Sequence, residues 1–94
     1  MDWGLGTSFA TSVITTTFIT EDGHPILEVS HEDDEEGGSL WQFHSGNGDY
    51  SAEKLMLVRL DTILKIDPTI DELRSLALGK VARRQRVGGE WVIT

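Results

Sequence analysis

Apolar and β-branched side chains fall in short runs that turn residues separate. Residues 12–20 are dense in Val, Ile and Thr, which suit a pleated strand. Asp22 and Gly23 follow as a turn signal, and residues 26–31 then alternate apolar and polar side chains. The two runs predict a β-hairpin with a connection of about four to six residues.

Residues 40–45 predict a third strand, because period two places Trp41 and Phe43 on one face and Leu40, Gln42 and His44 on the other. We expect Trp41 and Phe43 to pack in the core, since few other large side chains are available to fill it. An exposed aromatic platform for a ligand is the alternative for this pair. Residues 46–49 form a turn cluster, and residues 55–60 predict a buried fourth strand or the run into a helix.

Residues 61–66 predict a short helix with Asp61 as its cap, and Asp67 before Pro68 ends it because a residue before proline disfavours the helical region. A second helix follows, beginning either with Pro68 at its first position or with a capping box over residues 69–72. Its apolar stripe consists of Ile70, Leu73, Leu76 and Ala77. Gly79 then predicts a left-handed stop.

Residues 80–87 and 90–94 predict a C-terminal hairpin around two glycines. The expected fold is therefore α+β, with a mostly antiparallel sheet of about six strands and two short helices packed on one face. Residues 1–11 lack a clear period and predict a flexible N-terminal arm, on which Trp3 or Phe9 can still dock. Residues 12–94 are expected to form a single domain.

Charge is divided unevenly along the chain. All eight basic residues lie after position 53, whereas eleven of the sixteen acidic residues lie within the first 53 positions. These 53 residues carry a formal charge of −11 and the remainder carries +3. A negative region of this size repels phosphate backbones and attracts cationic partners, so we expect a protein partner and not a nucleic acid.

The densest acidic segment spans residues 32–38 and ends in two glycines. Its composition predicts a mobile, solvated loop, with contact to a partner protein as the functional alternative. Its carboxylates together with His31 are also candidate ligands for a divalent cation. Consecutive acidic residues point apart and lack the spacing of a calcium loop, so no metal and no cofactor are expected.

Catalysis has little support in the sequence. With no Cys there is no thiol nucleophile, and no serine nucleophile motif is present. A cluster of His24, His31 and His44 would require the first three strands to adjoin, and scattered histidines are more often surface or hydrogen-bonded residues. The sequence does not predict an enzyme. It also lacks a membrane-spanning run or an export signal, so a cytoplasmic location is expected.

Four basic side chains lie in the strand predicted over residues 80–87. Alternation splits them between two faces, which argues against a phosphate-binding row. We expect them to act as solubilising charges or as partners of the acidic loop, and contact with RNA is the functional alternative. They are Lys80, Arg83, Arg84 and Arg86.

Several short motifs make residues 12–92 similar to a small bacterial family. They are the leading strands, the acidic loop before Trp41-Gln42-Phe43, Ser45-Gly46, Asp67-Pro68, Gly79 with Ala82-Arg83, and Trp91. The family that they resemble was first described as a domain of unknown function and is now classed as immunity protein thirty-three of polymorphic toxin systems. This resemblance implies a cytoplasmic bacterial antidote that binds a cognate toxin. The turn at residues 46–49 is less acidic than the resemblance leads us to expect.

The leading hypothesis is an inhibitor whose acidic surface docks on a basic toxin surface. Its candidate partner-binding residues are Glu32, Asp33, Asp34, Glu35, Glu36, Asp49 and Glu53. The alternative hypothesis is a small regulatory or ligand-binding module with a pocket near Trp41, His44 and Trp91. The sequence does not determine the oligomeric state.

Overall fold

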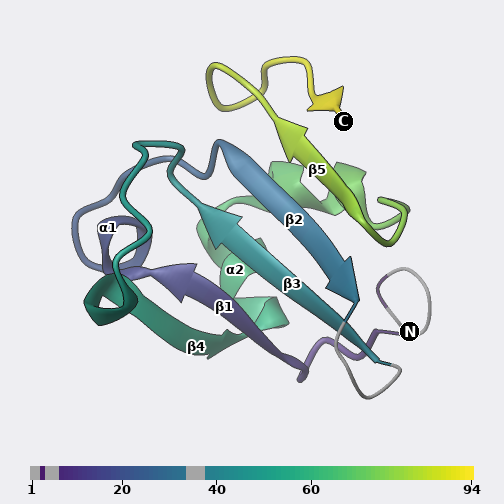
Figure 1. The fold of residues 1–94 in the computed structure, drawn as a ribbon, viewed down its shortest axis with the longest axis horizontal. Coiled ribbons are helices and arrows are strands. Elements are labelled where there is room, and N and C mark those ends of the chain that lie inside the picture. Colours follow the sequence, from purple (N-terminus) through teal and green to yellow (C-terminus); the bar gives the residue numbers. More distant parts are fainter. Residues whose placement is uncertain (1–2, 4–6, 34–37) are drawn as a thin grey trace.

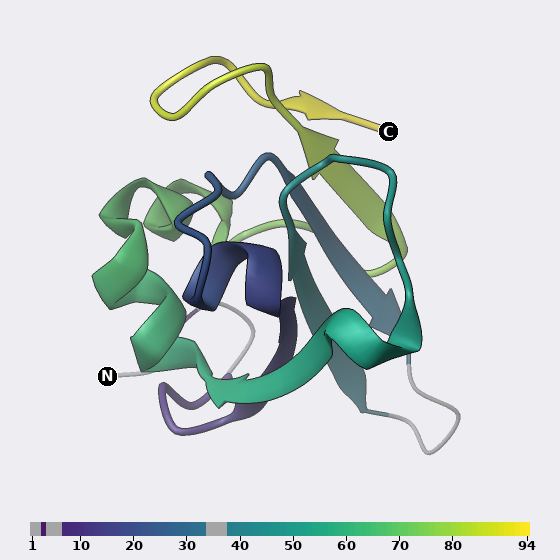
Figure 2. The ribbon, with the colours of Figure 1, turned by 90° about the vertical axis from the view of Figure 1, so that its left-hand side faces the viewer.

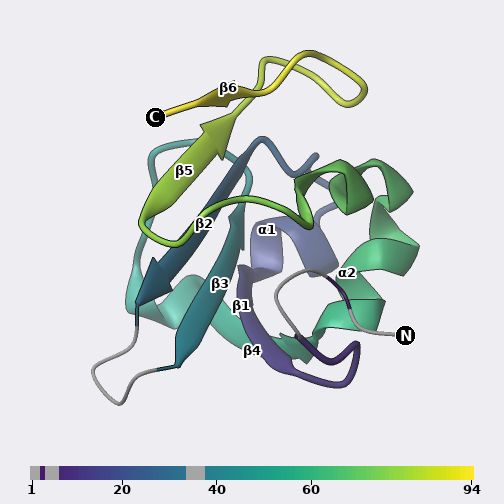
Figure 3. The same cartoon turned by 90° about the vertical axis from the view of Figure 1, so that its right-hand side faces the viewer.

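The computed structural model describes residues 3, 7–33 and 38–94 of the chain. Over these residues one sheet of six strands has the order β4-β1-β3-β2-β5-β6, and short helices lie on one of its faces (Figures 1, 2 and 3). The predicted α+β class is confirmed. In chain order the elements are β1 (Ser12–Thr16), α1 (Thr17–Thr20), β2 (Glu28–Asp33), β3 (Ser39–His44), η1 (Ala52–Lys54), β4 (Leu55–Arg59), α2 (Leu60–Ile66), η2 (Pro68–Leu73), β5 (Lys80–Arg83) and β6 (Val92–Ile93).

The predicted hairpin of the first two strands is wrong. The chain leaves the sheet after Thr16 and forms α1, which buries Ile19. Packing of this side chain outweighs the β-preference of the threonines around it. β1 pairs instead with β4, antiparallel, and with β3, parallel, where the Thr15 hydroxyl donates to the carbonyl of Phe43 at 3.0 Å.

The predicted alternation of the third strand is confirmed. Trp41 and Phe43 of β3 are buried on the helix-covered face, beside Val29 and His31 of β2. Trp41 is 1% exposed, so core packing and not an exposed platform describes this residue. The helices supply most of the other side of the core through Leu60, Ile63, Ile70 and Leu73, and Leu76 adds to it after the end of η2.

Trp3 is also a core residue, with no exposed surface. Its ring lies 4.5 Å from that of Trp41 in an edge-on arrangement, and its indole N–H donates to Asp71 at 3.1 Å. Phe9 packs partly against the same core. Docking of Trp3 and Phe9 therefore holds the described part of residues 1–11 on the domain.

The predicted cap of α2 is wrong. Arg59 is the N-cap residue, and the Asp61 carboxylate accepts hydrogen bonds from the Arg59 side chain. Pro68 does occupy the first position of the following helix, which is a 3-10 helix. Its cap is Asp67, whose Oδ1 accepts from the Thr69 N–H at 3.0 Å, so the capping-box alternative is also wrong.

The second helix is shorter than its apolar stripe predicts, because η2 ends at Leu73. Ile70, Leu73 and Leu76 are buried, but Ala77 is exposed. Gly79 has the predicted left-handed backbone, with a φ of +84°, but the helix stop predicted there is wrong, because η2 already ends at Leu73 and Gly79 lies in the turn before β5. The C-terminal hairpin of β5 and β6 is confirmed, although β5 ends at Arg83.

β4 is a strand that runs directly into α2, as predicted, but it is not buried. It forms an outer edge of the sheet, and the Leu57 side chain is 67% exposed. An apolar run of this kind has the same sequence pattern whether it lies in the middle or at the edge of a sheet. Its position was decided by the pairing of the other strands.

Candidate functional site on the open face of the sheet

Helices α1, α2 and η2 lie on one face of the sheet and leave the other face free of them, although η1 and the segment before it lie on that second side (Figures 2 and 3). We call this second face the open face. The strand register assigns to it the residues of β2 and β3 that alternate with the core positions. On these two central strands it presents Glu28, Ser30, Glu32, Leu40, Gln42 and His44.

A chain of hydrogen bonds crosses this face from β3 to β2. Nε2 of His44 lies 2.9 Å from Oε1 of Gln42, and Nε2 of Gln42 donates to Oε2 of Glu32 at 2.9 Å. Because an amide oxygen only accepts, Nε2 of His44 carries the proton in this contact. The chain of hydrogen bonds therefore ends on the carboxylate of Glu32, which is exposed to solvent.

A second polar group lies at the other end of β2. The Glu28 carboxylate accepts from the Tyr50 hydroxyl at 2.8 Å and from Nε of Arg83 at 2.9 Å. The hydrogen bond to Glu28 raises the pKa of Tyr50. The Tyr50 ring in turn contacts the His44 ring edge-on, with centroids 5.1 Å apart. Glu28 is thus fixed in place, while Glu32 is the carboxylate left facing solvent.

His44 is held neutral in this arrangement. Burial lowers its pKa below the ordinary value of 6.5, and the nearby carboxylates of Glu28 and Glu32 raise it by a smaller amount. Its Nδ1 is buried and has no hydrogen-bond partner among the residues that the structure describes. A proton added there would bring a charge into a site with no acceptor for it.

The predicted acidic surface is only partly assembled by the described residues. Glu32 and Asp33 are not in a loop but at the end of β2, where both are exposed. Their pairing with Leu40 and Ser39 extends the sheet beyond the predicted strand ends. The candidate residues Asp34, Glu35 and Glu36 lie outside the described residues.

Asp49 and Glu53 lie at a different place from Glu32. Asp49 follows β3, and its carboxylate accepts from the N–H and hydroxyl of Ser51, which lower its pKa. Glu53 is exposed in η1, next to β4. The register puts this end of β4 level with His44, while Glu32 lies level with Leu40. Two strands, β1 and β3, also separate β4 from β2. The described members of the predicted acidic set therefore lie at two separate places.

The pocket predicted near three side chains is not assembled either. Trp41 lies in the core beside His31, while His44 is three positions later on β3 and faces the opposite side. Trp91 lies elsewhere, with Cζ of the Arg84 guanidinium 4.2 Å from the centroid of its ring. Arg84 continues β5 beyond Ala82, at the other end of β2 from His31.

The three histidines have separate surroundings. His31 is fully buried, its Nδ1–H donates to the carbonyl of Leu76 at 2.7 Å, and its ring stacks on Trp41 at 3.9 Å. His24 is exposed and stacks on Phe18. Within residues 3, 7–33 and 38–94, no group of three His, Asp or Glu side chains is placed to hold a metal ion.

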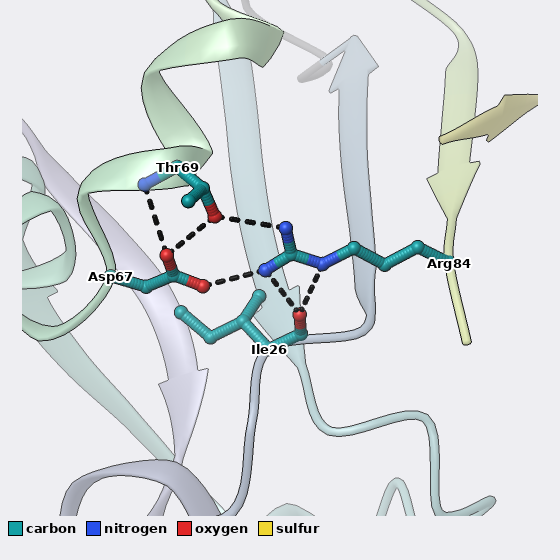
Figure 4. A network of polar contacts seen from close by, with 4 residues as sticks. All are labelled: Ile26, Asp67, Thr69 and Arg84. Carbon is teal, nitrogen blue, oxygen red and sulfur yellow. Dashed lines mark hydrogen bonds and ion pairs between the residues drawn. The ribbon is translucent and has the colours of Figure 1, made fainter. Parts of the chain in front are cut away.

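Arg84 is the one of the four basic side chains of residues 80–87 that differs most from the predicted role of a solubilising surface charge. Its side chain has no exposed surface, and Nη2 contacts Oδ2 of Asp67 at 2.6 Å (Figure 4). The guanidinium also donates to the carbonyl of Ile26 and to the hydroxyl of Thr69. The internal partner of Arg84 is thus Asp67 and not the acidic loop that the sequence suggested, because only the folded chain brings these acceptors together.

Glu28, Gln42 and Tyr50 are open-face residues that the sequence reasoning did not single out. The alternation of β2 and β3 was the available signal, since it places Glu28 and Gln42 on the face opposite the core. Tyr50 lies outside any strand, and only the folded chain brings it to Glu28.

Comparisons with protein-family models, curated proteins and solved structures find no match. No comparison therefore bears on the resemblance to immunity protein thirty-three, which rests on the short sequence motifs named above. None of the described helices is long and apolar enough to cross a membrane.

Proposed function

We propose that this protein is an immunity-type inhibitor that binds and neutralises a cognate bacterial toxin in the cytoplasm, without catalysing a reaction. The binding surface is the Glu32 end of the open face, together with Asp33 and the acidic residues that follow it in the chain. The partner is a protein with a basic surface, such as the groove in which a nuclease holds phosphate. The resemblance of the chain to the immunity family agrees with this role.

The observation that carries the proposal is the exposed carboxylate of Glu32, oriented by Gln42 and His44 on the face of the sheet that α1, α2 and η2 leave free. β2 and β3 contain no Lys or Arg, and the nearby Arg83 is already paired with Glu28. A fixed carboxylate loses less side-chain entropy on binding than a freely rotating one. Acidic side chains beside it would also speed association with a basic partner.

The test uses the products of the genes that flank the gene for this protein. Each is expressed in a bacterial host with and without the wild-type chain. We expect that one of them stops growth and that the wild-type chain restores it. If none is toxic, or if the chain fails to protect against the toxic one, the proposal is overturned.

A pair of variants then locates the surface. Glu32→Lys combined with Asp33→Lys reverses two exposed charges, and we expect a slower association rate and a loss of protection. Glu72→Lys is the matched control, because Glu72 is exposed on η2, away from the open face. Surface plasmon resonance measures the rates, and the difference should shrink at high salt as the Debye length falls from about 10 Å at 0.1 M to about 3 Å at 1 M. Equal rates for the folded Lys variant and the wild type at low salt would exclude this surface.

A further inference from the structure

The outer edge of β4 carries an apolar surface that nothing in the described structure covers. Leu55 and Leu57 are 36% and 67% exposed, and with Ile14 and Met56 they line a shallow hollow. β4 contains no Pro and no Gly, and its single charge is Arg59 at the end. Natural proteins usually protect sheet edges with charges, prolines, bulges or a covering segment, because an open edge pairs readily with another strand. β4 has no such protection among the described residues.

The main chain of β4 is arranged for this pairing. The Leu60 N–H donates to the carbonyl of Thr11 at 2.9 Å, and the register continues from there with Val58 opposite Val13. Because hydrogen-bonded positions alternate in an antiparallel pair, Leu57 and Arg59 direct their main-chain groups away from β1. At the opposite edge of the sheet, β6 is a strand of only two residues. β4 is therefore the edge with room for a further strand.

The local charge favours a second copy of this chain as the partner that supplies the further strand beside β4. The last residue of β4 and the residues beside the strand include two acids and two bases, so this edge is locally neutral in a molecule with a net charge of −8. A basic partner is attracted elsewhere, whereas two copies can approach each other here without strong repulsion. The four charged residues are Glu53, Lys54, Arg59 and Asp61.

We propose that two copies of the chain associate through antiparallel pairing of their β4 strands, which joins the two sheets into one. In the register that we infer, Leu57 lies opposite Leu55 of the second copy and Arg59 lies opposite Glu53 of the second copy. Two-fold symmetry repeats each of these contacts. Four leucines then cover one another on the open face, with Ile14 of each copy beside them. The neighbouring register, with Leu57 opposite itself, places Glu53 opposite Asp61 of the second copy and is disfavoured by like charge.

The first experiment measures the mass of the wild-type chain in solution by sedimentation over a wide range of concentration. We expect a mass that rises to twice the 10.4 kDa of one chain. Leu57→Lys should abolish this rise, since it places a charge at the centre of the pairing. Val92→Lys is the matched control, because Val92 is 62% exposed on the opposite edge and should leave the dimer intact. A monomer at every concentration, or a dimer that tolerates Leu57→Lys, would overturn the proposal.

The second experiment tests the register by disulfide trapping, for which the absence of Cys from the chain is convenient. A mixture of the Leu55→Cys and Leu57→Cys variants should form a covalent dimer under mild oxidation, while neither variant should do so alone. Directly opposite residues of a hydrogen-bonded pair have Cα atoms about 5.5 Å apart, within the roughly 4.4–6.8 Å that a disulfide spans. Efficient trapping of Leu57→Cys with itself would show that the register is wrong. Leu57→Lys leaves Glu32 unchanged, so this proposal and the proposed function fail independently.

Discussion

The guanidinium of Arg84 lies 2.6 Å from the carboxylate of Asp67, and the side chains of both residues are almost completely buried (Figure 4). This ion pair connects the segment after β5 to the start of η2. Asp67 contacts both segments, since its Oδ1 caps η2 and its Oδ2 accepts a hydrogen bond from Arg84. The C-terminal hairpin is thereby tied to the helices.

Removing one partner of this pair should be costly. Arg84→Met leaves the Asp67 carboxylate buried without its cation, and we expect a loss of about 3–5 kcal/mol in the free energy of unfolding. Chemical denaturation measures this loss. Arg74→Met is the matched control, since the Arg74–Asp71 pair is exposed and is worth about 0–1 kcal/mol. Adding Asp67→Asn to Arg84→Met should cost less than the sum of the single changes, and strict additivity would contradict a coupled pair.

Trp41 should contribute strongly to stability. Its ring contacts Trp3, His31 and Phe43, so Trp41→Ala opens a large cavity between the sheet and the N-terminal segment. We expect a loss of about 3–5 kcal/mol in the free energy of unfolding, measured by denaturant titration. If Trp41→Ala unfolds at the same denaturant concentration as the wild type, the ring is exposed in solution.

Trp3 tests whether the N-terminal segment belongs to the core. Trp3→Ala should destabilise the fold by a similar amount, about 3–5 kcal/mol, because the side chain has no exposed surface. Trp3→Phe keeps much of the bulk but loses the N–H donated to Asp71, and so should be less destabilising than Trp3→Ala. If Trp3→Ala unfolds like the wild type, residues 1–11 behave as the flexible arm that the sequence predicts.

The neutral state of His44 predicts that the free energy of unfolding depends on pH. Burial lowers the pKa of His44 in the native state, so the unfolded chain, with a His pKa near 6.5, takes up this proton first. Its contribution to stability is therefore complete above about pH 6.5 and is lost as the pH falls below that value. Urea unfolding at several pH values checks this, with NMR titration of the ring to follow the proton.

Two variants separate His44 from the other titrating groups. His44→Gln should reduce the loss of stability between about pH 6.5 and pH 5, because the titrating ring is gone. His24→Gln is the control for the loss of an imidazole, since His24 is exposed and lies outside this site. Identical profiles for the wild type and His44→Gln would contradict the assignment.

Local patterns in the sequence determined much of the secondary structure. The alternation around Trp41 and Phe43 predicted which face of β3 is buried, because period two leaves no other assignment for two large side chains. Pro68 marked a helix start and Gly79 a left-handed turn, since proline restricts and glycine permits particular backbone angles regardless of the rest of the fold. The α+β class followed from these elements.

Tertiary structure alone decided which strands pair and which charged groups are buried. The placement of β3 between β1 and β2 brings together residues distant in sequence, and hydrophobic period carries no information about strand order. The same holds for Arg84, which resembles its exposed neighbours in sequence. It can be buried only because Asp67, Thr69 and the Ile26 carbonyl, from two distant segments, converge on its guanidinium and replace the water that it loses.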